Sequence, residues 1–351
     1  VNFYPFQETI RKTKNFKKII ENIDIGGPSM VRAAAKNSKD VTIITDKKDY
    51  LKLIEELNKF KGKTSFNFRK KMASKAFGLT AYYDAVVSEW FNRDIGIEFP
   101  ERKTFFGKKI SQLRYGENPH QKSSIYINSL KNDDINLKHI NGKELSYNNY
   151  NDIFSSLDIL FSNLNSPSTV ITKHANPCGV SSNKSAFQSF LNAQASDPIS
   201  AFGGIVACNY KINNKIAQEI TKTFFEVILA KGFDNKALRI LKKKKNMRLI
   251  DISNFSYESK TSGKFFDNAF LLQERDNIVF NKKKLRCMTK NKPSSKELKD
   301  IEFAFKVCKY VKSNAIVIVK DNSTIGIGAG QQNRLDSCKI ATQKARKFQP
   351  N

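Results

Sequence analysis

Short apolar runs alternate with amphipathic stretches along most of the chain. Runs rich in β-branched and other apolar residues predict buried strands at 169–172, 205–208, 227–230 and 247–252. Apolar residues at helical spacing predict helices between these strands, at 185–195, 213–225 and 235–243. This order of strands and helices predicts an α/β fold with a largely parallel or mixed sheet.

Both flanks of this region carry similar patterns. A second α/β unit is expected from about residue 285, with a helix, two strands and a last helix at 293–311, 314–319, 324–330 and 331 onward. The first 60 residues also read as α/β, with strands and helices alternating at 1–6, 30–36, 40–46 and 47–60. A long apolar stripe predicts a helix over 65–91, and the aperiodic stretch 92–104 predicts a linker.

Chemistry is expected where the central strand at 169–172 ends, because Lys173 and His174 follow it directly. The sequence Asn-Pro-Cys-Gly at 176–179 predicts a turn, since Pro fixes φ and Gly permits positive φ. A base and a cation at the end of a strand lie where an open α/β sheet usually places its active site. The alternative is a histidine satisfied by structural hydrogen bonds beside a solvated lysine.

Polar and glycine-rich stretches offer further candidates. Leu113–Gln121 contains Arg114, whose guanidinium suits bidentate phosphate recognition, and Gly142–Asp152 leads into a helix that Asp152 is expected to cap. The three glycines of 326–330 permit close approach of the backbone to a ligand. Their spacing is not that of the dinucleotide-binding fingerprint.

A glycine turn at 26–28 leads into the Ala-rich helix of the first region. Pro28 suits the first turn of this helix, and the free N–H groups of a helix start can hold a phosphate. The same residues are equally typical of a well-capped helix without a ligand.

Charge and cysteine content limit the classes of function. The net charge is +28, which favours anionic ligands and raises nucleic-acid binding as an alternative, but the lysines are spread over the whole chain and no RNA-recognition or zinc-finger signature occurs. The five cysteines include no C-x-x-C pair, which favours reduced thiols in a cytoplasmic protein over a disulfide framework or a zinc site. No run of eighteen apolar residues predicts a membrane span.

Taken together, these stretches resemble the bifunctional family that joins AICAR (phosphoribosylaminoimidazolecarboxamide) formyltransferase to IMP cyclohydrolase. The similar segments occur in family order at Asn2–Phe6, Glu21–Asn37, Arg114–Gln121, Lys143–Asp152, Lys173–Gly179, Ser200–Gly204, Lys312–Asn314 and Gly326–Arg334. The resemblance implies a partial Rossmann-like (methylglyoxal-synthase-like) cyclohydrolase domain with a linker helix at 1–98. It also implies cytidine-deaminase-like α/β transformylase subdomains at 105–284 and 285–351.

The resemblance also implies chemistry and roles. The transformylase moves a formyl group from 10-formyltetrahydrofolate, its co-substrate, to the 5-amino group of AICAR, and the cyclohydrolase closes FAICAR to IMP with loss of water. By resemblance His174 is the general base and Lys173 stabilises the developing charge, which suits a weakly nucleophilic amine. The implied substrate-binding residues of the transformylase are Arg114, Tyr115, Asn149, Gly203, Glu226, Asn314 and Arg334. The cyclohydrolase positions matched here are Tyr4, Asp24 and Lys36.

Family likeness further implies a cytoplasmic homodimer that needs no metal for catalysis, with room for a monovalent cation, and with no specific nucleic-acid or membrane partner. The family's first domain begins before Val1 and its transformylase continues past Asn351, so we expect a fragment of a longer protein. The alternatives are a non-catalytic fragment of the family, a basic nucleic-acid-binding protein, and a zinc-dependent deaminase, which would need a His/Cys spacing that this sequence lacks.

Overall fold

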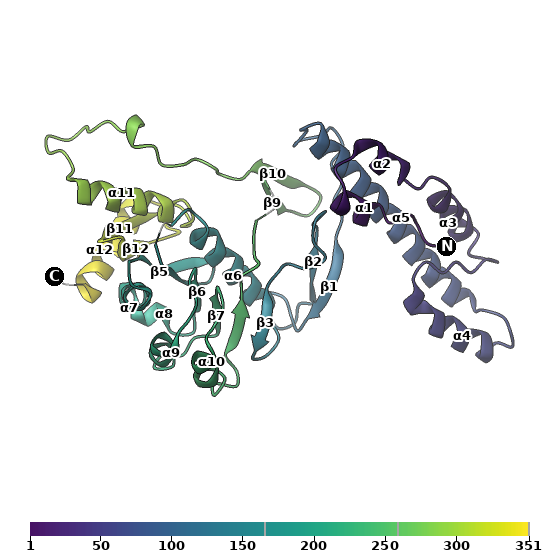
Figure 1. Ribbon diagram of the computed structural model, residues 1–351, viewed down its shortest axis with the longest axis horizontal. Coiled ribbons are helices and arrows are strands. Elements are labelled where there is room, and N and C mark those ends of the chain that lie inside the picture. Colours follow the sequence, from purple (N-terminus) through teal and green to yellow (C-terminus); the bar gives the residue numbers. More distant parts are fainter. Residues whose placement is uncertain (165, 258–259, 350–351) are drawn as a thin grey trace. The chain divides into compact units, whose positions relative to one another are not determined.

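The computed structural model describes residues 1–164, 166–257 and 260–349 and divides into two units, each with a core of its own (Figure 1). The first unit comprises Val1–Ile110, Tyr126–Ile135 and Lys260–Gln273, and the second comprises Ser111–Ile125, Asn136–Ser259 and Glu274–Asn351. A hairpin of β1 (Lys108–Leu113) and β2 (Ser123–Ile127) belongs partly to each unit.

Helices make up most of the first unit. They are α1 (Phe6–Lys12), α2 (Phe16–Glu21), α3 (Gly26–Lys36), the 3-10 turn η1 (Lys47–Asp49), α4 (Tyr50–Lys59) and α5 (Phe66–Asp94). A hairpin from a later part of the chain, β9 (Thr261–Phe265) and β10 (Phe270–Glu274), adds to them. Ser65 caps the long α5 by accepting a hydrogen bond from the N–H of Phe68, and apolar residues of α5 such as Tyr83 and Val86 pack on Phe6 of α1.

Two strands that the sequence predicts in this unit, at 1–6 and 40–46, do not form. Val1–Pro5 is irregular, and Phe6, only 1% exposed, opens α1 and anchors its packing. The stretch 41–46 buries Ile43 against α3 and α5, but among the described residues no strand pairs with it. The Val1 amino group donates a hydrogen bond to the carbonyl oxygen of Ile44 at 3.1 Å, and the N–H of Val41 donates to the carbonyl oxygen of Asn37 at 2.9 Å, but these bonds do not form a ladder. Apolar patterning predicts burial, whereas a strand also requires a neighbour for its ladder.

The second unit is built on a mixed sheet. In the described residues its strand order is β11-β12-β5-β4-β6-β7-β8-β3, in which β6, β7 and β8 run parallel and the other pairs are antiparallel. The strands are β3 (Lys138–Asn141), β4 (Ser168–Lys173), β5 (Asn176–Ser182), β6 (Ile205–Cys208), β7 (Val227–Ala230), β8 (Arg248–Asp251), β11 (Ile316–Lys320) and β12 (Ser323–Gly328). The helices are α6 (Tyr147–Leu160), α7 (Ala186–Ser196), α8 (Pro198–Ala201), α9 (Asn214–Ile220), α10 (Asn235–Leu241), η2 (Lys282–Lys284), α11 (Ser295–Cys308) and α12 (Arg334–Phe348). The predicted α/β class is therefore confirmed.

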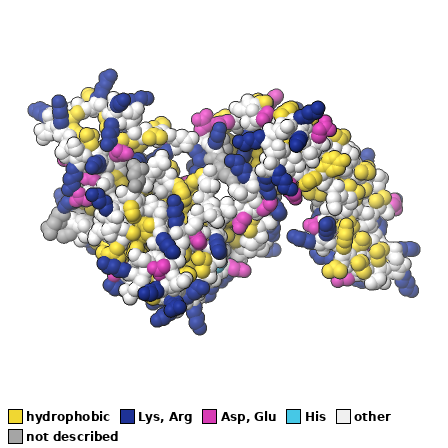
Figure 2. All heavy atoms as spheres, in the orientation of Figure 1, with side chains coloured by type: hydrophobic (Ala, Val, Ile, Leu, Met, Phe, Trp, Pro, Cys, Tyr) yellow, Lys and Arg dark blue, Asp and Glu magenta, His cyan; other side chains and the backbone are white. Residues whose placement is uncertain are grey.

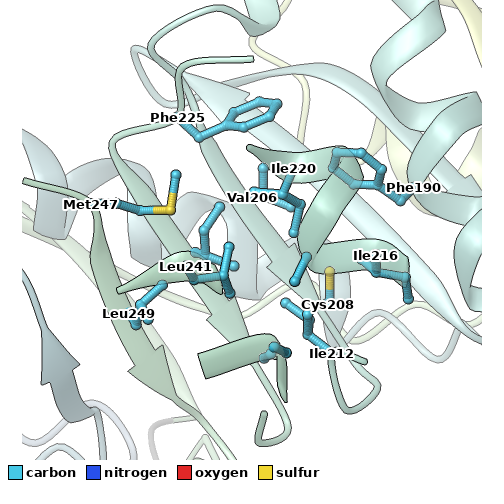
Figure 3. Close-up of a cluster of buried hydrophobic side chains, with 14 of the residues drawn as sticks. Phe190, Val206, Cys208, Ile212, Ile216, Ile220, Phe225, Leu241, Met247 and Leu249 are labelled. Carbon is cyan, nitrogen blue, oxygen red and sulfur yellow. The ribbon is translucent and has the colours of Figure 1, made fainter. Parts of the chain in front are cut away.

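Both faces of this sheet are covered by helices (Figure 1). Along β6, Val206 points into one apolar cluster while Ile205 and Ala207 point into the other, as the two-residue period of a strand requires. Figure 3 shows the first cluster, in which Val206 and Cys208 lie among helix side chains such as Phe190 and Ile216. Strands buried on both faces read as continuous apolar runs, which explains why sequence alone located them.

The hairpins β4–β5 and β11–β12 repeat one design. In β4–β5, Lys173 pairs with Asn176 across a two-residue turn, and the register shifts after Ile171. In β11–β12, Lys320 pairs with Ser323 across a two-residue turn, and the register shifts after Ile318. Each hairpin follows a helix, α6 or α11, and precedes another, α7 or α12.

Glycines of β12 serve helix packing. A Cβ at Gly326 or Gly328 would collide with a backbone carbonyl of α12, that of Ala341 or Ser337. The expected close approach of the backbone is therefore made to α12, because the helix lies directly on this strand.

Replacing Gly328 with alanine is expected to lower the free energy of unfolding of the second unit by about 1–3 kcal/mol, because the added methyl group overpacks the strand–helix contact. Urea unfolding measures the effect. The control is Gly78→Ala in α5, where a Cβ would meet nothing within 4 Å, so that this change should stabilise its helix by about 0.5–1 kcal/mol. Equal stability of Gly328→Ala and the parent would contradict the packing role.

Candidate active site at the β4–β5 turn

His174 and Ala175 form the turn between β4 and β5. Their φ angles are 53° and 57°, so both are left-handed, as in the type I′ turns that join two-residue hairpins. The turn predicted at 176–179 is wrong, because these residues already belong to β5. Their turn-like composition has another cause: the register shift falls beside Pro177, and a Cβ at Gly179 would collide with a carbonyl of α7.

Asp152 of α6 binds the backbone of this turn. Its carboxylate accepts hydrogen bonds from the N–H of Ala175 at 2.6 Å and from that of His174 at 3.2 Å. The expected capping role of Asp152 is wrong, because Ser146 and Asn149 form a capping box that starts α6 earlier. Burial raises the pKa of the Asp152 carboxyl, against the opposing effect of these two N–H groups.

The side chains of Lys173 and His174 differ in their hydrogen bonding. The Lys173 ammonium donates to the carbonyl oxygen of Phe202 at 2.8 Å, beside Gly203, which has a φ of 74°. Phe202 and Phe224 are both exposed, with ring centroids 5.5 Å apart. His174 is exposed, and within the described part of the chain no hydrogen bond ends on its imidazole. The imidazole is therefore available to a substrate.

Asn149 and Glu226 form a second polar group at this site. The Asn149 amide donates to Oε2 of Glu226 at 2.9 Å, and Nη1 of Arg248 lies 3.7 Å from the same oxygen. Arg248 is mostly buried and also donates to the carbonyl oxygen of Glu144 at 3.1 Å. The Glu226 charge contributes to the raised pKa of Asp152, which links this group to the turn. Sequence reasoning missed Arg248.

Arg114 and Tyr115 lie in a loop attached to α6. The Arg114 guanidinium lies 5.6 Å from the Tyr115 ring centroid, and Arg114 is exposed. The loop is closed by the N–H of Gly116, which donates to Gln121 O at 2.7 Å. The Asn148 amide donates to the carbonyl oxygen of Glu117 at 3.1 Å, so this hydrogen bond attaches the loop to the start of α6, next to Asn149.

Asn176 connects the turn to the segment that contains Asn314. The Asn176 side chain donates to the carbonyl oxygen of His174 at 3.2 Å and accepts from the N–H of Lys312 at 3.3 Å. The Asn314 amide donates to the carbonyl oxygen of Gln331 at 3.0 Å. Arg334, the first residue of α12, is exposed, and in the described part of the chain no hydrogen bond or ion pair joins it to the turn. From the sequence, Asn176 was assigned only to a predicted turn and not to the site.

In the first unit, Asp24 fixes the start of α3. Its Oδ1 accepts from the N–H of Gly27 at 2.7 Å and its Oδ2 from that of Tyr4 at 3.0 Å. The glycine turn is thus a well-capped helix start whose N–H groups are partly occupied. Tyr4 lies beside Asp24, whereas Lys36 is at the other end of α3, roughly 15 Å along its axis at about 1.5 Å per residue.

A cysteine of β5, Cys178, also lies near this site. Burial raises the pKa of the Cys178 thiol to about 12, so this cysteine next to the site is not a thiolate nucleophile at neutral pH. Among the described residues, no group of three or more His, Cys, Asp or Glu side chains is arranged to hold a metal ion. The helices described here include none with the length and apolar character needed to cross a membrane.

The second unit is thus an α/β protein that gathers a histidine, a lysine and a carboxylate–amide pair around one hairpin turn. The chain belongs to the AICARFT/IMPCHase bienzyme family, whose model matches residues 34–344. This confirms the resemblance drawn from the sequence, and it favours the enzyme over the nucleic-acid-binding alternative. Figure 2 shows Lys and Arg side chains distributed over the visible face and interspersed with Asp and Glu.

Individual relatives agree with the family assignment. The chain is 45% identical to the bifunctional purine biosynthesis protein PurH of a Thermoanaerobacter species, over 98% of this chain and 68% of that protein. It is 45% identical to PurH of Parvibaculum lavamentivorans, over 98% and 65% of the two chains. It is 44% identical to PurH of Persephonella marina, over 99% and 68%. The chain thus spans between 65% and 68% of the length of these relatives.

Proposed function

We propose that this chain acts in purine biosynthesis by transferring the formyl group of 10-formyltetrahydrofolate to the 5-amino group of AICAR. The observation that carries the proposal is the pair of half-buried Lys173 and exposed His174, which a clamped turn holds beside the Asn149–Glu226 group. Family membership supplies the class of reaction.

The transfer needs a base and a stabiliser of negative charge. The amine nitrogen of AICAR attacks the formyl carbon, and His174 accepts the proton that this nitrogen loses. Lys173 stabilises the oxyanion of the tetrahedral intermediate with the N–H groups that it does not use on Phe202. The bond from the formyl carbon to N10 of the folate then breaks, and N10 takes up a proton to give tetrahydrofolate and FAICAR.

The remaining candidate residues bind AICAR. Asn149 and Glu226 offer an amide and a carboxylate to its polar groups, and Gly203 keeps the space beside the Lys173 ammonium open. The side chains proposed to hold its phosphate and ribose are Arg114, Tyr115, Asn314 and Arg334.

For the rest of the protein, the proposals follow the family. Residues 1–98 form part of a cyclohydrolase domain that converts FAICAR to IMP through Tyr4, Asp24 and Lys36, and 105–284 and 285–351 are transformylase subdomains. The protein works in the cytoplasm as a homodimer, and its transformylase requires no metal ion. A monovalent cation is left as a further candidate ligand.

Formyl transfer is tested by following tetrahydrofolate formation by absorbance, with AICAR binding measured in parallel by calorimetry. Turnover that depends on both substrates supports the proposal. A folded protein with neither turnover nor AICAR binding would be the non-catalytic member of the family. Salt-sensitive binding of DNA or RNA without turnover would instead support the nucleic-acid-binding alternative.

Replacing Arg114 with alanine is expected to raise the KM for AICAR about tenfold or more while kcat changes little, because the loss of a phosphate contact weakens ground state and transition state alike. Steady-state kinetics at saturating folate measures both constants. The control is Arg239→Ala on α10, which removes another exposed arginine and should leave both constants unchanged. A fall in kcat without a change in KM would contradict the binding role of Arg114.

A further inference from the structure

The hairpins β4–β5 and β11–β12 share one more feature, an aspartate that is hydrogen-bonded to the backbone of the turn. In the second hairpin, Asp300 of α11 accepts hydrogen bonds from the N–H of Asp321 at 3.1 Å and from that of Asn322 at 2.7 Å. This is the geometry that Asp152 makes with His174 and Ala175. Both aspartates lie six residues after the serine that caps their helix.

The residues within the two turns differ in how easily they adopt the left-handed conformation. Asp321 and Asn322 have φ angles of 54° and 52°, and Asn and Asp are the side chains that most readily tolerate this region. Ala175, with a φ of 57°, has no side-chain group that could stabilise such a backbone locally. The first turn is therefore strained where the second is not, and strain of this kind concentrates at functional sites.

Asp152 is well placed to hold the strained turn. Each of its oxygens accepts one N–H group, so a single carboxylate fixes both left-handed residues. The ionisable side chains that act on this carboxylate are His174 on the turn itself and Glu226 before β7. The backbone conformation of the turn, and with it the position of the His174 imidazole, thus depends on Asp152.

We propose, on the basis of the formyl-transfer function above, that Asp152 is a positioning residue whose carboxylate holds the strained turn and thereby sets His174 against the amine of AICAR. Asp152 touches the backbone of the turn and acts on the reaction only through His174. Asp300 performs the same structural task for a turn that carries no catalytic group.

The test compares Asp152→Ala with Asp300→Ala. Asp152→Ala is expected to lower kcat about tenfold or more with the KM for AICAR within about twofold, because a small misplacement of a catalytic group is costly. Asp300→Ala should leave both constants unchanged. Amide hydrogen exchange provides a readout without activity: the N–H groups of His174 and Ala175 should lose protection in the first variant, and those of Asp321 and Asn322 in the second.

A compensating change gives a result that general destabilisation would not. Glycine adopts positive φ freely, so Ala175→Gly in the Asp152→Ala background should recover about threefold or more of the lost kcat. Where Asp152→Ala does not fold, Asp152→Asn keeps the volume and one acceptor oxygen and is expected to show the same loss of kcat.

Three outcomes would overturn the proposal in distinguishable ways. Loss of amide protection with unchanged kcat would leave Asp152 as a structural clamp only. Equal losses of kcat in the Asp152 and Asp300 variants, without rescue by Ala175→Gly, would show a general effect on stability. Absence of formyl transfer in the parent protein would overturn the function itself, and the exchange data would then show whether the clamp exists without it.

Discussion

Replacing His174 with alanine is expected to reduce kcat for formyl transfer by about 10²–10⁴-fold, the usual contribution of a positioned general base. The dissociation constant for AICAR should stay within about twofold of its parent value, because the imidazole acts on the proton of the amine while other side chains bind the nucleotide. Single-turnover kinetics with saturating folate measures the chemical step, and calorimetry measures AICAR binding. The structure supports this separation, since the imidazole is exposed and the recorded hydrogen bonds of His174 all end on its backbone.

The matched control for this prediction is His139→Ala. His139 is also exposed, but it lies on β3 at the edge of the sheet, where a ring nitrogen of its imidazole is hydrogen-bonded to the carbonyl oxygen of Asn141 at 2.7 Å. Its removal should leave the chemical step unchanged. Full turnover of His174→Ala would show that another group takes the proton, and equal losses in both histidine variants would point to a nonspecific effect.

The parts of this fold that sequence predicts best are those whose residues serve a single purpose. Strands such as β6 and β7 are buried on both faces, so each reads as an uninterrupted apolar run. β5 was not predicted, because Pro177 and Gly179 have the composition of a turn. Tertiary contacts explain these two residues: the register of β5 shifts against β4 beside Pro177, and α7 passes close to Gly179. No local pattern distinguishes those reasons from a turn.

The candidate site shows the same division. Lys173, His174 and Asn149 were identified through motifs, and hydrogen bonds connect each of them to the rest of the site. Asp152 was assigned to a helix cap, because a polar residue near a helix start usually has that role. A weak signal was present in the repeat: the spacing from Ser146 to Asp152 recurs from Ser294 to Asp300.

Comparison of the two strands adds to that signal. The pattern Val-Ile-x-Lys, with a glycine six residues after the lysine, occurs at 170–179 and again at 317–326. Such internal similarity would have aligned His174 with Asp321 and exposed the difference between the two turns. What the sequence could not supply is the hydrogen bonding that gives each aspartate its role.

Replacing Lys173 with methionine is expected to lower kcat by about 10²–10³-fold, the usual effect of removing one donor to an oxyanion. An ammonium has three N–H groups, and the hydrogen bond to the carbonyl oxygen of Phe202 uses one of them, so two remain for the intermediate. Methionine keeps most of the length and apolar surface of the side chain but removes the charge. The chemical step is measured by single-turnover kinetics, as for His174.

The repeat offers a matched control, Lys320→Met. Lys320 ends β11 as Lys173 ends β4, before a turn with the same register, but the turn that follows it holds Asp321 in place of the histidine. Its replacement should leave kcat unchanged, while Lys173→Arg should retain part of the activity because charge and donors remain. If Lys173→Met lost only folate affinity, with kcat intact, the ammonium would serve to hold the Phe202–Gly203 loop and not to stabilise the oxyanion. If it lost kcat and Lys320→Met did not, the chemical difference between two nearly identical hairpins would lie in the pair Lys173–His174.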